Sequence, residues 1–144
     1  MRTSDNNPAV SNALRIAKAA AAAVLSHARS QPTLEVCGLL AGIRDVADVF
    51  LPAANALNSA KAYEIAPAEL FSLFRQMRDG KLELIGIVHS HPTGENFPSE
   101  TDIALAYYPS TPYVIVSPRG DASRPLRAFR IQSGSVQEIE VEEV

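Results

Sequence analysis

The chain has 144 residues, of which 47% are hydrophobic and 20% are charged. A chain of this length and balance is expected to fold as one globular domain rather than to remain disordered. The formal net charge of -3 excludes the basic excess that nucleic-acid-binding surfaces normally carry. The single cysteine, Cys37, excludes an internal disulfide and a cysteine-rich zinc knuckle, and it is typical of a cytoplasmic protein.

The first part of the chain predicts a polar terminus followed by a helix. Residues 1–13 are interpreted as a flexible terminus and residues 14–144 as the folded domain. The short apolar piece 14–16 leads into an alanine-rich helix expected over 17–29, which Pro32 prevents from continuing. The apolar run in this helix is much shorter than the roughly twenty residues of a membrane span, so no membrane anchor is expected.

The central part of the chain predicts two strands and a second helix. The apolar run 36–41, which contains Gly38, is expected to be a buried strand that another backbone approaches closely. A second strand is expected over 46–51. A helix is expected over 67–79, with a proline in its first turn and a glycine after its end. Its core face is expected to consist of Leu70, Phe71, Phe74 and Met77.

The last part of the chain returns to strands. The dense apolar run 82–88 suits a central strand. A helix is expected to begin near Ser99, followed by a strand over 113–116 and a hairpin of strands 126–131 and 136–141. Strands and helices interleave around one core. The predicted class is therefore α/β or α+β, with one domain built on a mixed or mainly antiparallel central sheet flanked by helices.

The strand expected over 82–88 runs directly into His89-Ser90-His91-Pro92. In an extended chain, residues two apart point to the same side, so both imidazoles can reach one metal ion. The apolar strand supplies a rigid support, and Pro92 ends it immediately after the second histidine. The same pattern also occurs as a plain strand end followed by a turn, so the two histidines alone do not establish a metal site.

The segment from Pro98 to Asp102 has the signature of a helix start, with Ser99 as the expected N-cap. Two interpretations of Asp102 follow from it. As part of a capping box, the carboxylate points back at the backbone amide of Ser99. As a metal ligand, the same carboxylate points at the histidines.

Two histidines and one carboxylate are a ligand set of catalytic zinc, which keeps its fourth position for water. Zinc lowers the pKa of that water to about 7, and a proton acceptor that is not itself a ligand is still needed. Glu35 is the candidate for this base, because it is an isolated carboxylate at the start of the apolar run 36–41.

These residues resemble the motif of the JAMM (MPN-plus) metalloprotease family. The family pattern is a glutamate, followed much later by His-x-His, seven residues, a serine, two residues and an aspartate. Glu35, within Glu-Val-Cys-Gly-Leu-Leu, matches the first element, and His89-Ser90-His91 matches the second. The seven residues 92–98 precede Ser99, and Asp102 completes the pattern.

The resemblance covers residues 14–131 and implies the JAMM/MPN fold, which is similar to that of cytidine deaminases. It implies that Zn²⁺ is bound by His89, His91 and Asp102. Glu35 would be the general base that passes a proton to the leaving amine, and Ser99 would donate a hydrogen bond to the developing oxyanion. The implied reaction is hydrolysis of an amide or isopeptide bond without a covalent intermediate.

The resemblance also implies a substrate class. Minimal prokaryotic members act on small ubiquitin-like or sulfur-carrier proteins that end in Gly-Gly, either trimming an extension or an attached cysteine or reversing conjugation to lysine. After Asp102, residues 103–108 lead into the strand at 112–116 without room for the insertion of linkage-selective eukaryotic members, which implies a minimal bacterial or archaeal type. With its Glu-Val-Cys-Gly-Leu-Leu-Ala-Gly segment and short length, the chain most resembles the members that process sulfur carriers. The expected partner is such a carrier in the cytoplasm, without nucleic acid or membrane, and a homodimer is compatible with the sequence. Glu95 and Phe97 are expected to border the substrate channel or to fill the loop.

Several alternatives stand beside this interpretation. A non-catalytic scaffold of the same fold is disfavoured because all five motif residues are present. A zinc nucleoside deaminase needs a thiolate pair, and the chain has one cysteine. Cys37, two residues after Glu35, either faces the metal or behaves as a small apolar residue, and the second interpretation is favoured. His27 is interpreted as a helix-end cation rather than as a third ligand.

Overall fold

The computed structural model describes residues 12–144, so residues 1–11 of the predicted flexible terminus lie outside the described residues. Within the described range, seven strands alternate with three helices. In chain order they are β1 (Ala13–Ile16), α1 (Lys18–Ser30), β2 (Cys37–Ile43), β3 (Val46–Ala53), α2 (Pro67–Asp79), β4 (Glu83–Ser90), α3 (Glu100–Ala104), β5 (Tyr113–Val116), β6 (Leu126–Gln132) and β7 (Ser135–Glu143). The predicted start of the domain at residue 14 stays a prediction, although β1 already includes Ala13.

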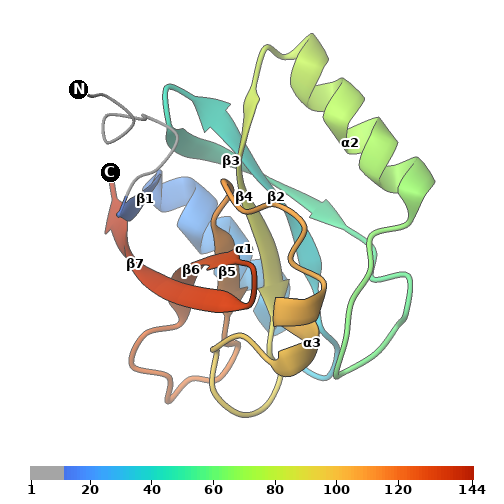
Figure 1. Cartoon of the computed structure of the whole chain (residues 1–144), viewed down its shortest axis with the longest axis vertical. Helices are drawn as coiled ribbons and strands as arrows, with labels where there is room; N and C mark the ends of the chain where they lie inside the picture. Colours follow the sequence, from blue (N-terminus) through green and yellow to red (C-terminus); the bar gives the residue numbers. More distant parts are fainter. Residues whose placement is uncertain (1–11) are drawn as a thin grey trace.

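The strands form a mixed sheet that closes into a barrel in the order β1-β3-β2-β4-β5-β6-β7. β1 lies between β3 and β7 and is parallel to both, with Leu14 opposite Val141 (Figure 1). The mixed sheet predicted from the sequence is confirmed. Closure was not predicted, because the piece 14–16 was expected only to lead into the helix, whereas it is part of the strand that joins the two ends of the sheet.

α1 covers one face of the sheet. Its buried residues are mostly alanines, and they recur every three or four positions, so a stripe of small side chains lets the helix lie close to the strands. Val24 is fully buried among residues of the strands, including Val88 of β4 and Val114 of β5. This packing places a hydrophobic core between α1 and the sheet.

α2 packs against the opposite face and carries the second core, in which Leu73 and Met77 meet Leu39 and Ile87. Its expected core face is partly wrong. Phe71 is 62% exposed, because it lies beside rather than on the stripe that contains Leu73. The helix bounds are as predicted, since Pro67 occupies the first turn and Gly80 follows the last residue.

The close approach predicted for the strand that contains Gly38 is confirmed. A Cβ placed on Gly38 would lie 2.5 Å from the carbonyl oxygen of Leu51 on β3 and 2.6 Å from the Phe50 ring. Any side chain at this position would therefore push β2 away from β3. The close packing matters for the site, because β2 also pairs with β4, which carries the histidines.

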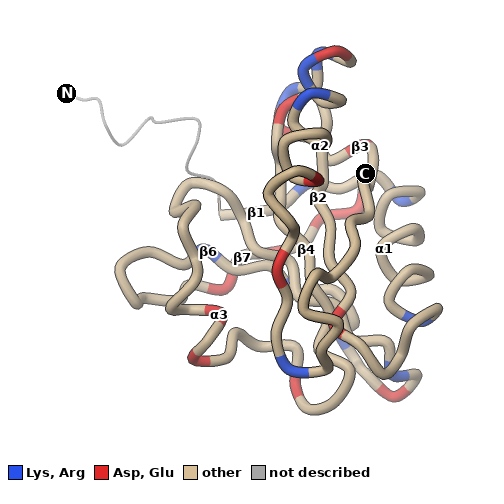
Figure 2. Tube along the Cα trace, turned by 90° about the vertical axis from the view of Figure 1, so that its right-hand side faces the viewer, with Lys and Arg blue, Asp and Glu red and all other residues tan. Residues whose placement is uncertain are grey.

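Basic and acidic positions are interspersed over the molecule, and α2 carries both signs (Figure 2). The expectation that the protein does not bind nucleic acid stays a prediction. None of the helices within residues 12–144 has the length and hydropathy needed to cross a membrane.

Candidate metal centre

The two histidines lie at the end of β4, in the middle of the closed sheet. His89 pairs with Cys37 of β2 on one side and with Ile115 of β5 on the other, and its side chain is 1% exposed. His91 follows the strand, and its backbone N–H donates to Val116 O of β5 (3.0 Å). The two Nε2 atoms are 3.2 Å apart. The prediction that both rings face the same point is therefore confirmed.

Asp102 lies in the first turn of α3 and satisfies both interpretations that the sequence left open. Its Oδ2 accepts a hydrogen bond from the backbone N–H of Ser99 (2.9 Å), and its own N–H donates to Ser99 Oγ (3.1 Å). The same Oδ2 lies 3.2 Å from His89 Nε2 and 3.0 Å from His91 Nε2. The capping box thus orients the carboxylate toward the histidines, so cap and ligand are one arrangement.

The three side chains have the geometry of a zinc site. Their donor atoms all lie within 4.8 Å of one another, and the three closest separations are 3.0 to 3.2 Å. Ligand atoms bonded to tetrahedral zinc at about 2.0–2.1 Å lie roughly 3.3 Å apart, which is close to these separations. Two imidazoles and one carboxylate also form the donor set that leaves a position for water. The residues therefore fit zinc.

Glu35 lies just before β2 and is 4% exposed. Its backbone is tied on both sides: its N–H donates to Ser59 O (2.9 Å), and its carbonyl accepts from Asn55 Nδ2 (2.9 Å). Its Oε1 is a buried carboxylate oxygen without a hydrogen-bond partner among the described residues. A carboxylate held in place with one unpaired oxygen is suited to accept a proton.

Burial raises the pKa of Glu35 to about 7, while the charge of His91 lowers this pKa and the charge of Asp102 raises it by smaller amounts. The pKa of the predicted ligand Asp102 is shifted in the opposite direction. Burial also opposes ionisation of Asp102, but hydrogen bonds from both histidines hold the pKa of its carboxyl well below its usual range. Two carboxyl groups with pKa values pushed apart in this way are typical of one proton-transferring group and one permanently ionised group.

The two imidazoles differ as well. Burial lowers the pKa of His89. Burial acts in the same direction on His91, but hydrogen bonds to Asp102 and to the Glu95 carbonyl outweigh it and leave the pKa of His91 raised. Neutral imidazole is the form that binds a metal.

Three further contacts were not predicted from the sequence. The ring of Tyr63 stacks on His89, with centroids 4.5 Å apart and an interplanar angle of 19°. Asn55 holds the loop that precedes α2, because its Nδ2 also donates to Ala62 O (3.0 Å). The carbonyl of Glu95 lies 2.9 Å from His91 Nδ1. All three depend on residues distant in sequence or on backbone atoms, which a one-dimensional pattern does not reveal.

The structure shows where Cys37 and His27 lie. Cys37 is fully buried, and its Sγ lies 3.6–3.7 Å from the carbonyls of Ala53 and Ala54 rather than in the histidine cluster. Burial raises the pKa of its thiol to about 12, so it behaves as the small apolar residue that was favoured. His27 lies in the last turn of α1, as expected, where it packs against Phe50 and burial lowers its pKa.

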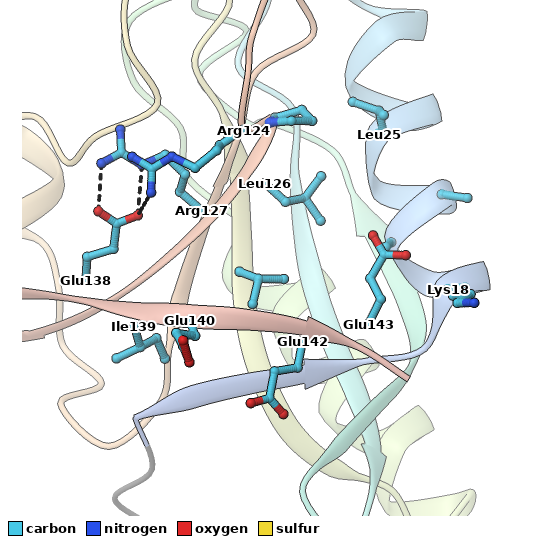
Figure 3. Close-up of a pocket in the computed structure, with 14 residues that line it drawn as sticks. Lys18, Leu25, Arg124, Leu126, Arg127, Glu138, Ile139, Glu140, Glu142 and Glu143 are labelled. Atoms are coloured by element: carbon cyan, nitrogen blue, oxygen red, sulfur yellow. Dashed lines mark hydrogen bonds and ion pairs between the residues drawn. The ribbon is translucent and has the colours of Figure 1, made fainter.

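Two of the grooves formed by residues 12–144 lie on different parts of the surface. One, of about 320 Å³, contains His89 and Asp102 and has otherwise mainly apolar and tyrosine walls. Leu105, Tyr107 and Tyr108 of this groove are exposed. The other groove, of about 730 Å³, lies between α1 and the strands β6 and β7, contains none of the five predicted site residues, and is rimmed by charged side chains (Figure 3). The metal centre therefore opens onto an apolar surface.

Comparison with known proteins gives consistent results. The profile of a family described as prokaryotic homologs of the JAB domain matches residues 17–132, which include all five predicted site residues. The CysO-cysteine peptidase of Mycobacterium tuberculosis is 37% identical over 118 residues, which cover 81% of this chain and 81% of that protein. The desampylase of Haloferax volcanii is 38% identical over 117 residues, which cover 76% of this chain and 84% of that protein.

The fold has a counterpart among solved structures. A JAB1/MPN domain protein from Archaeoglobus fulgidus aligns with a TM-score of 0.61 at 23% sequence identity, covering 90% of this chain and 99% of that one. At this identity the likeness concerns the fold alone. The fold class expected from the sequence is therefore confirmed.

Proposed function

We propose that this chain, which belongs to the prokaryotic JAB-domain family, is a zinc-dependent peptidase. Membership of this family confirms the resemblance to JAMM proteins. The observation that supports the proposal is that Nε2 of His89, Nε2 of His91 and Oδ2 of Asp102 lie 3.0 to 3.2 Å from one another. The charges of His91 and Asp102 also act on the buried Glu35, whose pKa is raised to about 7. The bond cleaved is an amide or isopeptide bond at the Gly-Gly tail of a small ubiquitin-like or sulfur-carrier protein.

Each residue has a role in this proposal. His89, His91 and Asp102 hold the zinc, which when bound activates water and polarises the scissile carbonyl. Glu35 accepts a proton from the attacking water at its unpaired Oε1 and delivers it to the leaving nitrogen. Ser99 accepts from the Asp102 amide, so its hydroxyl hydrogen remains available to donate to the carbonyl oxygen as that oxygen becomes negative.

The substrate proposal is supported by the similarity to a CysO-cysteine peptidase and to a desampylase, and by the shape of the groove. The groove that contains His89 and Asp102 offers an apolar wall that includes Leu57 and Leu105. Apolar side chains of a carrier tail would lie along this wall, while a terminal Gly-Gly pair lets its backbone approach the metal closely because glycine has no side chain.

The short connection between α3 and β5 supports a minimal enzyme. Only residues 105–112 separate the two elements, so no long insertion covers the metal centre on that side. We also place the enzyme in the cytoplasm, where a lone protonated thiol such as Cys37 remains reduced. The competing function is a non-catalytic scaffold, which would not need Glu35 to be buried with an unpaired oxygen.

The experiment that tests the proposal combines zinc analysis with mass spectrometry of three carrier substrates. One carries a C-terminal extension after Gly-Gly, one a cysteine adduct and one a lysine isopeptide. We expect one zinc per chain and cleavage of at least one substrate that a chelator abolishes. Glu35→Gln is expected to keep the zinc and to lose about 100-fold to 10,000-fold of the turnover, the usual contribution of a general base.

Glu83→Gln is the matched control, because this exposed glutamate lies at the other end of β4. It should retain both zinc and turnover. Stoichiometric zinc without cleavage of any substrate would support the scaffold. A wild-type protein that takes up no zinc after reconstitution would contradict the proposal.

A further inference from the structure

The loop between the two parts of the metal centre has no regular structure. Residues 92–98 join His91 to Ser99, and Thr93, Gly94 and Glu95 within this loop are exposed. Gly94 has a positive φ of 76°, and a Cβ there would meet nothing within 4 Å. The loop nevertheless contributes directly to the site, because the Glu95 carbonyl is the acceptor for His91 Nδ1 at 2.9 Å. An exposed loop can hold this acceptor in place only if something fixes its backbone.

Asn96 contributes a buried polar side chain to this loop, and only 7% of the residue is exposed. Its Nδ2 lies within hydrogen-bond distance of three backbone carbonyls: Ile115 O at 3.2 Å, Arg124 O at 2.8 Å and Pro125 O at 3.2 Å. Carbonyl oxygens only accept, so the amide nitrogen of the side chain must be the end that faces them. The side chain therefore fastens the loop to the end of β5 and to the segment that leads into β6.

The fastened residue is joined to the acceptor of His91 by a single peptide bond. The Glu95 carbonyl belongs to the planar peptide unit between Glu95 and Asn96, so holding Asn96 in place restricts how far that carbonyl can turn away from His91. When Nδ1 of His91 donates to the carbonyl, Nε2 keeps its lone pair for a metal and the ring cannot rotate away. His89 has no such partner, since its Nδ1 is buried and unpaired among the described residues.

We propose that Asn96 is a positioning residue for the metal ligand His91, acting through the Glu95 carbonyl. It does not touch metal or substrate. The inference rests on the proposed zinc site and adds to it the means by which the loop ligand is oriented.

Two of the three carbonyls that accept from Asn96, those of Arg124 and Pro125, lie on a segment that is itself held in place. Glu138 of β7 forms ion pairs with Arg124 (3.0 Å) and Arg127 (2.8 Å), drawn as dashed lines in Figure 3. The guanidinium of Arg127 lies 5.6 Å above the ring of Phe97, the residue next to Asn96. Phe97, expected to border the substrate channel or to fill the loop, thus packs against this segment. Asn96 links the loop to β5 and to the segment that leads into β6.

The test measures zinc affinity by competition with a chelator. Asn96→Ala removes the donor, and we expect its zinc affinity to fall about 10-fold to 100-fold, the usual effect of losing a partner of a metal-binding histidine. Asn96→Asp places a carboxylate against three carbonyl oxygens and should lose at least as much. Asn96→Ser keeps one hydroxyl donor and should lose less, and it replaces the alanine variant in every comparison if that variant does not fold.

Val24→Ala is the matched control, because it opens a cavity under α1 in the core away from the loop. It should lower the melting temperature without changing the zinc affinity. The second readout is the downfield proton resonance of His91 Nδ1–H in the zinc-loaded protein. We expect it in the wild type and in Val24→Ala, and expect it to be lost or broadened by exchange with water in Asn96→Ala.

Two results would overturn the inference, and they are distinguishable. If the wild type binds zinc and the Asn96 variants bind it within 3-fold of the wild type with the Nδ1–H resonance intact, Asn96 only stabilises the fold, and the proposed function stands. If the wild type itself binds no zinc, the proposed function fails and the inference fails with it.

Discussion

The two halves of the metal centre are supported in different ways. Glu35 and His89 lie where β2 and β4 pair, and the hydrogen bond from Ser90 N to Val36 O (3.0 Å) continues the contact between the two segments. His91 and Asp102 lie beyond the strands, on a loop and on the five-residue helix α3, none of whose residues is buried. One half is formed by the paired strands and the residues just before β2. The other half is formed by a loop and a short helix, which are attached to the sheet by hydrogen bonds and by the packing of Ile103 against the core.

The comparison teaches which half needs the metal. Sheet hydrogen bonds form with the fold and do not depend on a ligand, so Glu35 and His89 should keep their positions in the metal-free protein. A short exposed helix is marginal by itself, and bonds from two histidines to one carboxylate contribute much of what holds α3 in place. The loop half is therefore expected to be the less stable region.

Removal of zinc should loosen the loop half selectively. At a free zinc concentration of about 1,000 times the dissociation constant, binding stabilises the native state by about 4 kcal/mol, so a chelator should lower the melting temperature. Hydrogen exchange followed by mass spectrometry should show faster exchange over residues 93–102 and little change over 37–43 and 83–89. Equal acceleration of all three segments would show that the two halves do not differ.

Glu35→Gln should stabilise the metal-free protein, and more so at higher pH. Burial raises the native pKa of Glu35 from 4.5 to about 7, so the folded state binds this proton more tightly than the unfolded state. The wild type therefore loses stability as the pH rises from about 4.5 through 7, whereas glutamine has no proton to lose. The advantage of the variant should grow by up to about 3 kcal/mol between pH 5 and pH 8, at 1.36 kcal/mol per pKa unit.

Urea unfolding of chelator-treated protein at the two pH values measures this difference, with Glu83→Gln, at an exposed position of β4, as the control for replacing a glutamate. A difference between Glu35→Gln and the wild type that does not depend on pH would show that Glu35 ionises freely in the folded state.

Ser90→Ala should weaken the sheet half without affecting the metal. The buried hydroxyl of Ser90 accepts from Val36 N (2.8 Å) and donates to Leu34 O (3.3 Å), so it is hydrogen-bonded to the residues on both sides of Glu35. Its loss leaves a buried N–H unpaired, which should cost about 2 kcal/mol of unfolding free energy. Turnover should fall with it while the zinc affinity stays unchanged.

Ser117→Ala is the control for this prediction, because its buried hydroxyl accepts from Arg119 N (3.3 Å) away from Glu35. Denaturant unfolding and kcat measured on zinc-loaded protein distinguish the two variants. An equal loss of kcat in both variants would mean that the hydrogen bonds of Ser90 beside Glu35 have no specific effect on turnover.

Glu138→Gln should have the smallest effect. Its ion pairs to Arg124 and Arg127 are partly exposed, so their loss should cost less than about 1 kcal/mol and diminish further in high salt. The zinc affinity should change much less than in Asn96→Ala, because the backbone carbonyls that receive Asn96 remain. Thermal unfolding and zinc competition at low and high salt provide the check, and a zinc loss as large as that of Asn96→Ala would show that the ion pairs themselves set the position of the loop.

The sequence predicted the elements whose signals are local. The strand over 113–116 has the expected bounds, and the helix expected over 17–29 is shifted by one residue, because apolar runs, alanine propensity and a following proline act within a few positions. β1 was not predicted, because a four-residue strand has little periodicity and its partner strand β7 is distant in sequence. Phe71 was misplaced because neighbouring apolar positions on a helix allow more than one stripe.

For the site, the sequence predicted the groups that carry chemistry better than the groups that hold them. His89, His91 and Asp102 follow from spacing and family resemblance, and the structure brings them together. The roles of Glu35 and Ser99 stay predictions. Asn96 could not be identified, because its partners are backbone carbonyls at 115, 124 and 125, and any residue can supply a carbonyl. A supporting contact of this kind becomes visible only in three dimensions.

The closure of the sheet by β1 has a consequence for how the protein is made. The ribosome synthesises Ala13–Ile16 long before Ser135–Glu143, yet these two strands are direct neighbours in the barrel. The barrel therefore cannot close before β7 has been synthesised, and closure is a late step in folding. The ligands from His89 to Asp102 emerge before that step, so the nascent chain carries its full zinc-binding set while the barrel around it is still open.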